Sequence, residues 1–105
     1  MTREELEDIA ERHAMCLNGN DEDEEDFADF EGADLAGSDF SGLYFAEVDF
    51  TGANLENANF EGTNLMYADF TRANLKGANF KGAIIVKTCF EGANIEGANF
   101  EGAVK

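Results

Sequence analysis

The residues most able to do chemistry in this sequence are His13 and Cys16. They lie three positions apart, so a helix would place an imidazole and a thiol on one face, where the imidazole could activate the thiol as a nucleophile. Such a pair also needs a third group that orients the base, and two candidate ligands do not complete a zinc site. We therefore interpret the pair as part of a packing face, and we predict no catalytic residue, no cofactor and no metal site.

A run of consecutive acidic residues, DEDEED at 21–26, suggests calcium binding. The EF-hand loop requires Gly at its sixth position and Glu at its twelfth, but Asp26 and Gly32 stand there. The run therefore fits a solvated linker better. Cys89 lies far from Cys16 in the sequence, and we expect both thiols to be reduced, with Cys89 facing solvent.

The length and charge of the chain limit its class. With 105 residues it has room for one domain, and its formal net charge is −16, from 23 acidic and 7 basic residues. This charge disfavours binding to nucleic acid or to an anionic membrane, and it leaves proteins as the expected partners. The sequence shows no signal peptide and no apolar run of roughly 20 residues, so we expect a cytoplasmic protein without a membrane span.

Residues 1–19 have the pattern of an amphipathic helix. Thr2 and Glu5 have the spacing of a capping box, and an Asn-Gly pair supplies a stop signal. The apolar stripe of this helix comprises Leu6, Ile9, His13, Cys16 and Leu17. We divide the chain into this helix, an acidic linker at 20–26 and a repeat region at 27–105.

A period of five residues dominates the repeat region. From 30 to 100, every fifth residue is large and apolar, and we term it the central residue of its unit. The residue two positions before it is usually Ala, Ser or Thr; the residue two positions after it, the corner residue, is Gly in ten of fifteen units. A backbone that turns every five residues would bury one large and one small side chain per unit, with Gly accommodating a positive φ at the corner.

The units GADLA, GANLE, GANFK and GANIE resemble the A(D/N)LXX motif of the pentapeptide-repeat family, and the match covers about three quarters of the chain. This resemblance implies a right-handed quadrilateral β-helix with four units per coil. We therefore predict an all-β solenoid of just under four coils, with an N-terminal capping α-helix. With coils spaced like the strands of a sheet, the rod would be roughly 20 Å long.

The stretch HAMCLNG at 13–19 is also similar to a group of bacterial, often prophage-associated, members of this family. In that group a short helix carrying His-x-x-aromatic-Leu-x-Gly precedes the repeats, and Cys16 stands here in place of the aromatic residue. The resemblance implies a bacterial origin and a capping role for the helix, but no activity.

Stacking units of successive coils sorts the central residues into four faces, which we number in chain order. The predicted core is Phe30, Phe50, Phe70 and Phe90 on face 1; Leu35, Leu55, Leu75 and Ile95 on face 2; Phe40, Phe60, Phe80 and Phe100 on face 3; and Phe45, Leu65 and Ile85 on face 4. Phe thus faces Phe across the rod, as layered packing requires. Outside, Glu56, Lys76 and Glu96 form a ladder of alternating sign.

Face 4 breaks the polar pattern of the other faces on its outer side. Its outward positions hold Tyr44, Ala46, Met66, Tyr67, Ile84 and Val86. Gly never occupies its corner, where Glu47, Tyr67 and Lys87 stand instead, so we expect a different turn type there. A contiguous exposed apolar strip is typical of an interaction surface.

Three alternatives remain for what covers this surface: the N-terminal helix folded back over it, a second copy of the chain, and a different protein. Self-association could use face 4 or the C-terminal end of the rod, where unpaired backbone would be exposed. The family resemblance favours the end, since several members dimerise through their C-terminal coils.

The sequence thus predicts a non-enzymatic structural or protein-interaction module, a rigid rod that binds a second copy or another protein. The alternative is an acidic mimic of DNA that binds a DNA-handling enzyme such as DNA gyrase, because some family members protect gyrase in this way. The rod is short for that role, since one turn of duplex DNA is roughly 34 Å long. The stretch 30–100 also has no insertion that could form a projecting loop.

Overall fold

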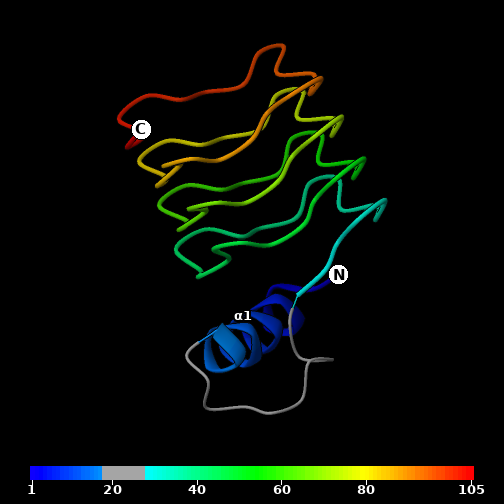
Figure 1. Ribbon diagram of the computed structural model, residues 1–105. Coiled ribbons are helices and arrows are strands. Elements are labelled where there is room, and N and C mark those ends of the chain that lie inside the picture. Colours follow the sequence, from blue (N-terminus) through cyan, green and yellow to red (C-terminus); the bar gives the residue numbers. More distant parts are fainter. Residues whose placement is uncertain (18–27) are drawn as a thin grey trace.

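The structure, a computed structural model, describes residues 1–17 and 28–105 and has two parts. Helix α1, Arg3–Leu17, is followed by a right-handed quadrilateral β-helix (Figure 1). The helix lies across one end of the solenoid, and the Cα atoms together span 39 × 25 × 25 Å. The predicted fold class, a solenoid of just under four coils with an N-terminal capping helix, is confirmed.

Parallel β-bridges hold the coils together, and each of them joins residues one coil apart. On face 1, for example, Asp29 pairs with Asp49, and Asp49 pairs with Asp69. The bridges involve single residues because the chain turns a corner in every unit. Around each bridge, backbone N–H groups donate to the next coil, as from Phe30 to the carbonyl oxygen of Asp49 at 2.8 Å. This register aligns the central residues of each face in the interior.

Each corner is a four-residue turn closed by a backbone hydrogen bond. At the first corner, Ala33 donates to the carbonyl oxygen of Phe30 at 3.0 Å, and Gly32 has a φ of 68°. In most units the residue before the central residue supports the same corner: the side chain of Asp29, for example, accepts a hydrogen bond from the N–H of Glu31 at 3.0 Å. This Asx turn recurs along the solenoid and gives the physical reason why the motif favours Asp or Asn.

The Phe rings order the interior. Along a face the rings stack nearly parallel, as do Phe40 and Phe60, whose centroids are 4.6 Å apart at an interplanar angle of 8°. Across the rod they meet edge to face, as Phe50 and Phe60 do at 5.7 Å and 85°. Offset stacking and edge-to-face contact are the arrangements that aromatic pairs prefer. These three rings are completely buried.

The last coil departs from the predicted core. Ile95 is 47% exposed, and Phe90 and Phe100 are only half-buried. In this chain no further coil packs on them, so they lack the neighbours that bury the equivalent residues below. The prediction that every central residue is buried is therefore wrong for Ile95.

Helix α1 begins with the predicted capping box. The hydroxyl oxygen of Thr2 accepts a hydrogen bond from the N–H of Glu5, and the carboxylate of Glu5 accepts one from the N–H of Thr2, both at 3.1 Å. Hydrogen bonding to Thr2 lowers the pKa of Glu5. The start of the helix is therefore fixed locally by its sequence.

One side of α1 closes the N-terminal end of the solenoid. Leu6 and Ala10 are buried in the same cluster as the first Phe rings. At the start of the helix, the guanidinium of Arg3 donates to the carbonyl oxygen of Ser41 on face 3 at 2.7 Å. Within the described part of the chain, no helix is long and apolar enough to cross a membrane.

Candidate interaction surface

The outer side of face 4 carries an apolar strip. Its members are Tyr44, Met66, Tyr67, Ile84 and Val86. The tyrosines are the most exposed, Tyr67 at 51% and Tyr44 at 39%, and the other three are half-buried. Bridges from Tyr44 to Asn64 and from Asn64 to Ile84 stack the three coils directly on one another. The strip therefore runs along the rod over three coils, with the polar Asn64 between Tyr44 and Ile84.

Ala46 is not part of this strip, and the prediction that it faces solvent is wrong. The residue is only 6% exposed. Its carbonyl oxygen accepts a hydrogen bond from Nε2 of His13 at 2.6 Å, so α1 covers the base of face 4. The open question about the helix is thereby answered: α1 caps the end of the rod and reaches only the first coil of this face.

The corner of face 4 has the same turn as the other corners, so the prediction of a different turn type is wrong. Glu47, Tyr67 and Lys87 have φ values of 67°, 63° and 56°, close to those of the corner glycines. The closing hydrogen bond is also present, as from Ala68 to Leu65 at 2.9 Å. A left-handed conformation costs a residue other than Gly roughly 1–2 kcal/mol. Face 4 therefore carries side chains at positions where Gly would be more stable.

Face 4 also lacks most of the Asx turns that support the other faces. Tyr44 and Ile84 occupy the position of Asp or Asn, so no carboxylate or amide there accepts from the following backbone. Only Asn64 keeps the bond, accepting from the N–H of Met66 at 3.1 Å. A hydrogen bond of this kind contributes roughly 0.5–1.5 kcal/mol. The turns after Tyr44 and Ile84 are therefore less stable than they would be with Asp or Asn at these positions.

The charge of face 4 differs from that of the rest of this acidic protein. Glu47 is its acidic residue, and Lys87 and Lys105 are its basic residues. The ammonium group of Lys87 lies 5.6 Å from the centre of the Tyr67 ring, a cation–π distance. The upper coils of face 4 are therefore apolar and weakly basic.

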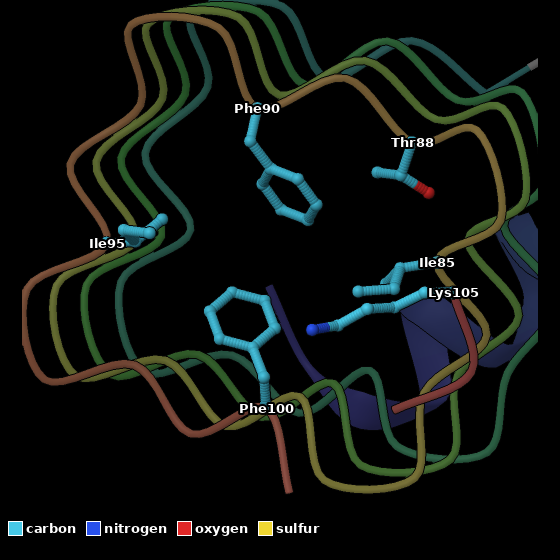
Figure 2. A pocket seen from close by; sticks show the side chains of 6 residues that line it. All are labelled: Ile85, Thr88, Phe90, Ile95, Phe100 and Lys105. Carbon is cyan, nitrogen blue, oxygen red and sulfur yellow. The ribbon is translucent and has the colours of Figure 1, made fainter. Parts of the chain in front are cut away.

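The end of the last coil holds a second candidate surface. A shallow cavity of about 380 Å³ opens there. Figure 2 shows its lining, which is Ile85, Thr88, Phe90, Ile95, Phe100 and Lys105. Its apolar character comes from the core residues that the last coil leaves partly uncovered.

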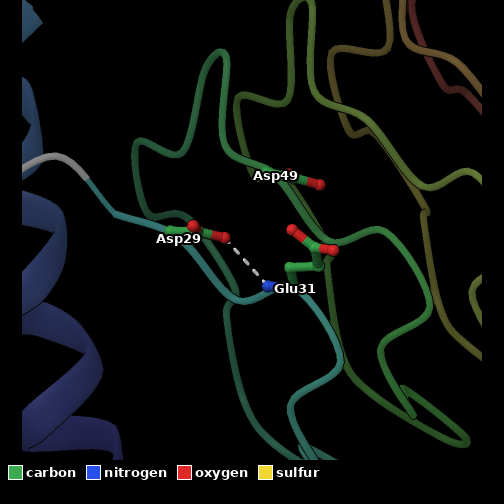
Figure 3. A group of neighbouring side chains, drawn as sticks. All are labelled: Asp29, Glu31 and Asp49. Carbon is green, nitrogen blue, oxygen red and sulfur yellow. Dashed lines mark hydrogen bonds between the residues drawn. The ribbon is translucent and has the colours of Figure 1, made fainter.

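Three carboxylates on the first two coils lie close together (Figure 3). Oxygen atoms of Asp29, Glu31 and Asp49 lie within 4.8 Å of one another. Asp29 and Asp49 already accept backbone hydrogen bonds in Asx turns, and Asp29 and Glu31 are exposed. Such a group is explained by the repeat itself and does not define a metal site. The acidic linker at 20–26 lies outside the described residues.

Both ring nitrogens of the histidine bond to backbone groups. The N–H of Ala28 donates to Nδ1 of His13 at 3.0 Å, so Nε2 carries the proton and donates to the carbonyl oxygen of Ala46. Burial lowers the pKa of His13, against a smaller opposite effect of that carbonyl bond. The neutral imidazole thus connects α1 to the first coil. Cys16 is half-buried, and Cys89 is exposed as expected.

The predicted ladder of Glu56, Lys76 and Glu96 is present as a column of side chains, but within the described part of the chain these side chains form no ion pairs. Among the described residues, the ion pairs within 4.0 Å involve Arg3 and Arg12, both on α1, and Lys76 is in none. Exposed ion pairs contribute little because water screens them. Sequence reasoning missed the contact of Arg3 with Ser41, since no local pattern marks a contact between segments so far apart in the chain.

Comparison with known proteins agrees with this geometry. Residues 27–100 match the family model described as "Pentapeptide repeat region". The chain therefore belongs to the pentapeptide repeat family. No curated protein matches it.

Solved structures of pentapeptide repeat proteins are similar to this chain. One, from the thylakoid lumen of Arabidopsis thaliana, is 38% identical with a TM-score of 0.70, and the match covers 70% of this chain and 51% of that one. Another is HetL of the cyanobacterium Nostoc, described as involved in heterocyst differentiation regulation. It is 29% identical with a TM-score of 0.69, over 72% of this chain and 38% of HetL. The chain thus spans about half or less of these relatives.

A likeness to QnrB1, a plasmid-mediated fluoroquinolone resistance protein, is weaker. Its identity is 21% and its TM-score 0.38, too low to carry an argument about function. The alternative of an acidic DNA mimic that binds gyrase gains no support from this comparison.

Proposed function

We propose that this protein is a non-enzymatic protein-interaction module whose binding surface is the apolar strip of face 4. Pentapeptide repeat proteins are generally structural or interaction modules. The observation that carries the proposal is the corner column of face 4, where Glu47, Tyr67 and Lys87 all hold a left-handed conformation in place of Gly, whereas faces 1 and 2 each have one such corner, at Arg72 and Asn57. Backbone conformations of this cost persist at functional sites.

The exposed side chains support the same function. A soluble protein rarely keeps a continuous apolar strip, and tyrosines are enriched in the centre of protein interfaces. Tyr67 is at the middle of the strip and half exposed. The chain has no comparable side chains on face 2, where Asn54 and Asn74 occupy the outer positions. A location in the cytoplasm and the absence of nucleic-acid partners remain predictions.

Photo-crosslinking in cells that produce the protein tests this function. A photoreactive amino acid placed at position 67 should crosslink to one discrete protein. That protein can be a different one or a second copy of the chain. The same group at Asn57, the equivalent corner of face 2, is the matched control because its φ of 59° is also positive. Equal or absent crosslinking from the two positions would contradict the proposal.

A further inference from the structure

We propose that the occupant of face 4 is a second copy of the chain, bound face to face and antiparallel about a twofold axis at the level of Tyr67. The inference rests on the proposed function and names the partner. Its basis is the order of side chains in the corner column, which holds Glu47, Tyr67 and Lys87 in three successive coils. When two such columns run in opposite directions, the negative residue of each lies opposite the positive residue of the other.

The symmetry follows from the shape of the face. Two identical faces that meet antiparallel are related by a twofold axis lying in the interface and running across both rods. This axis places each column opposite the same column of the other copy, in reversed order. Glu47 then faces Lys87 of the second copy, Lys87 faces Glu47 of the second copy, and Tyr67 faces Tyr67. One geometry thus forms two equivalent ion pairs around a central aromatic pair.

The bridge residues and Met66 fit the same arrangement, whereas Val86 would face Ala46, which α1 already covers. Met66 faces Met66 of the second copy on the axis, and Tyr44 faces Ile84, so apolar groups meet apolar groups. Asn64 faces Asn64, whose amide has both donors and an acceptor and can pair with its own copy. In none of these columns does a charge meet a like charge.

A parallel pairing lacks this complementarity. With the twofold axis along the rods, residues at the same height face each other, and Glu47 stays two coils away from Lys87 of the second copy. Two coil steps amount to roughly 9.5 Å, too far for an ion pair. The charges of the corner column therefore select the antiparallel arrangement.

Both charged groups are available for this contact. Glu47 and Lys87 are exposed, and neither is in an ion pair within 4.0 Å among the described residues. The ammonium group of Lys87 lies over the ring of Tyr67, and this contact keeps the positive charge at the strip. The residues that face each other in this arrangement lie on only three coils, so the buried area is smaller than the roughly 800 Å² per partner of a standard interface. We therefore expect a weak, reversible dimer with a Kd in the micromolar range or above.

Charge exchange tests the arrangement. Sedimentation velocity over a concentration series from about 10 μM to about 1 mM would compare wild type with Glu47→Lys, with Lys87→Glu and with the double variant. Each single variant places like charges opposite each other and should weaken association by about tenfold or more; the double variant should restore it to near the wild-type value. Lys76→Glu on face 2 makes the same change in net charge as Lys87→Glu and should leave association unchanged. Thermal melting confirms that each variant is folded.

Three results would overturn the inference. The first is a wild-type protein that stays monomeric, which together with crosslinking from position 67 to another protein would leave the proposed function intact. The second is a double variant as weak as the single ones, since the facing pairs would then be different. The third is association that resists all these changes but is lost in Ile95→Glu, because the copies would then meet through the last coil.

Discussion

Faces 2 and 4 lie opposite each other, and they differ most on the outside. Inside, both have aliphatic central residues in the second coil, Leu55 and Leu65, which are completely buried, although the first central residue of face 4 is Phe45. Outside, face 2 has a ladder of amides in which Asn74 donates to Asn54 at 3.3 Å, and Asn54 donates to Asp34 at 3.2 Å. Face 4 has an apolar strip instead.

This difference separates what the fold requires from what it permits. The central residues are large and apolar and the corner geometry is the same on both faces, so these features specify the solenoid. The outward positions contribute only modest hydrogen bonds and ion pairs, each roughly 1 kcal/mol or less, and can therefore be replaced without loss of the fold. Outward side chains that lower local stability, as on face 4, are accordingly the ones to assign to function.

The largest expected effect lies in the part that the two faces share. Leu55→Ala and Leu65→Ala should each lower the free energy of unfolding by roughly 3–5 kcal/mol, because each leaves a cavity in a fully packed interior. The two values should agree within about 1 kcal/mol. Denaturant unfolding measures both, and a mild effect at only one of the two positions would show that the interior is not packed equally well behind the two faces.

A smaller effect is expected at the base of face 4, which α1 covers. His13→Ala should cost roughly 2–4 kcal/mol, since the buried N–H of Ala28 and carbonyl of Ala46 both lose their partner. Burial lowers the pKa of His13 in the folded protein, so the unfolded chain binds the proton more readily. This part of the stability is fully present above pH of about 6.5 and is lost as the pH falls below it.

The pH dependence has a direct control. Between pH of about 7.5 and about 5.5, wild type should lose more stability than His13→Ala, because the variant lacks the titrating group. Chemical denaturation at several pH values measures the difference. Parallel curves for the two proteins would mean that the protonation of His13 is not coupled to folding.

Corner substitutions on the two faces should change the free energy of unfolding in opposite directions. Tyr67→Gly on face 4 should stabilise the monomer by about 1 kcal/mol, because Gly adopts a positive φ without steric cost. Gly37→Ala on face 2 should destabilise it by about the same amount, since its φ is 70° and the added Cβ meets nothing within 4 Å. Thermal melting at low protein concentration would show both shifts, and a destabilised Tyr67→Gly would contradict the assignment of strain to this corner.

The smallest effect is expected in the charged ladder of face 2. Lys76→Ala should change the free energy of unfolding by less than about 0.5 kcal/mol, because the ammonium group is exposed and forms no ion pair within 4.0 Å among the described residues. A loss above 1 kcal/mol in low salt, absent in high salt, would show that such ladders do stabilise the outside of the rod.

The solenoid itself was predictable because its pattern is local. The central residue recurs in every unit, and the Gly or Asx turn at each corner uses neighbours in the chain, so periodicity and turn chemistry determine the coil. The place of α1 was not predictable in the same way. It depends on contacts of Arg3 with Ser41 and of His13 with Ala46, which join distant segments.

The candidate surface was predictable only in part. Outward apolar residues such as Tyr67 follow directly from the register. The burial of Ala46 depends on its contact with α1, a distant segment of the chain. The turn at Glu47 is the same as at the other corners because the repeat imposes it, whichever residue occupies the corner. A residue other than Gly at a corner signals strain in the same turn, because the closing hydrogen bond and the stacked coils impose the conformation.

Sedimentation velocity of two matched double variants tests the central claim most directly. Tyr67→Glu with Ile84→Asp adds two charges to face 4, and Asn57→Glu with Asn74→Asp adds two at the equivalent positions of face 2. The fold tolerates both residue types there, since Glu47 occupies a corner and Asp34 a bridge position. We predict that wild type and the face 2 variant associate equally and that the face 4 variant is monomeric at every concentration. Association of wild type that both variants retain equally would contradict the claim that face 4 is the binding surface.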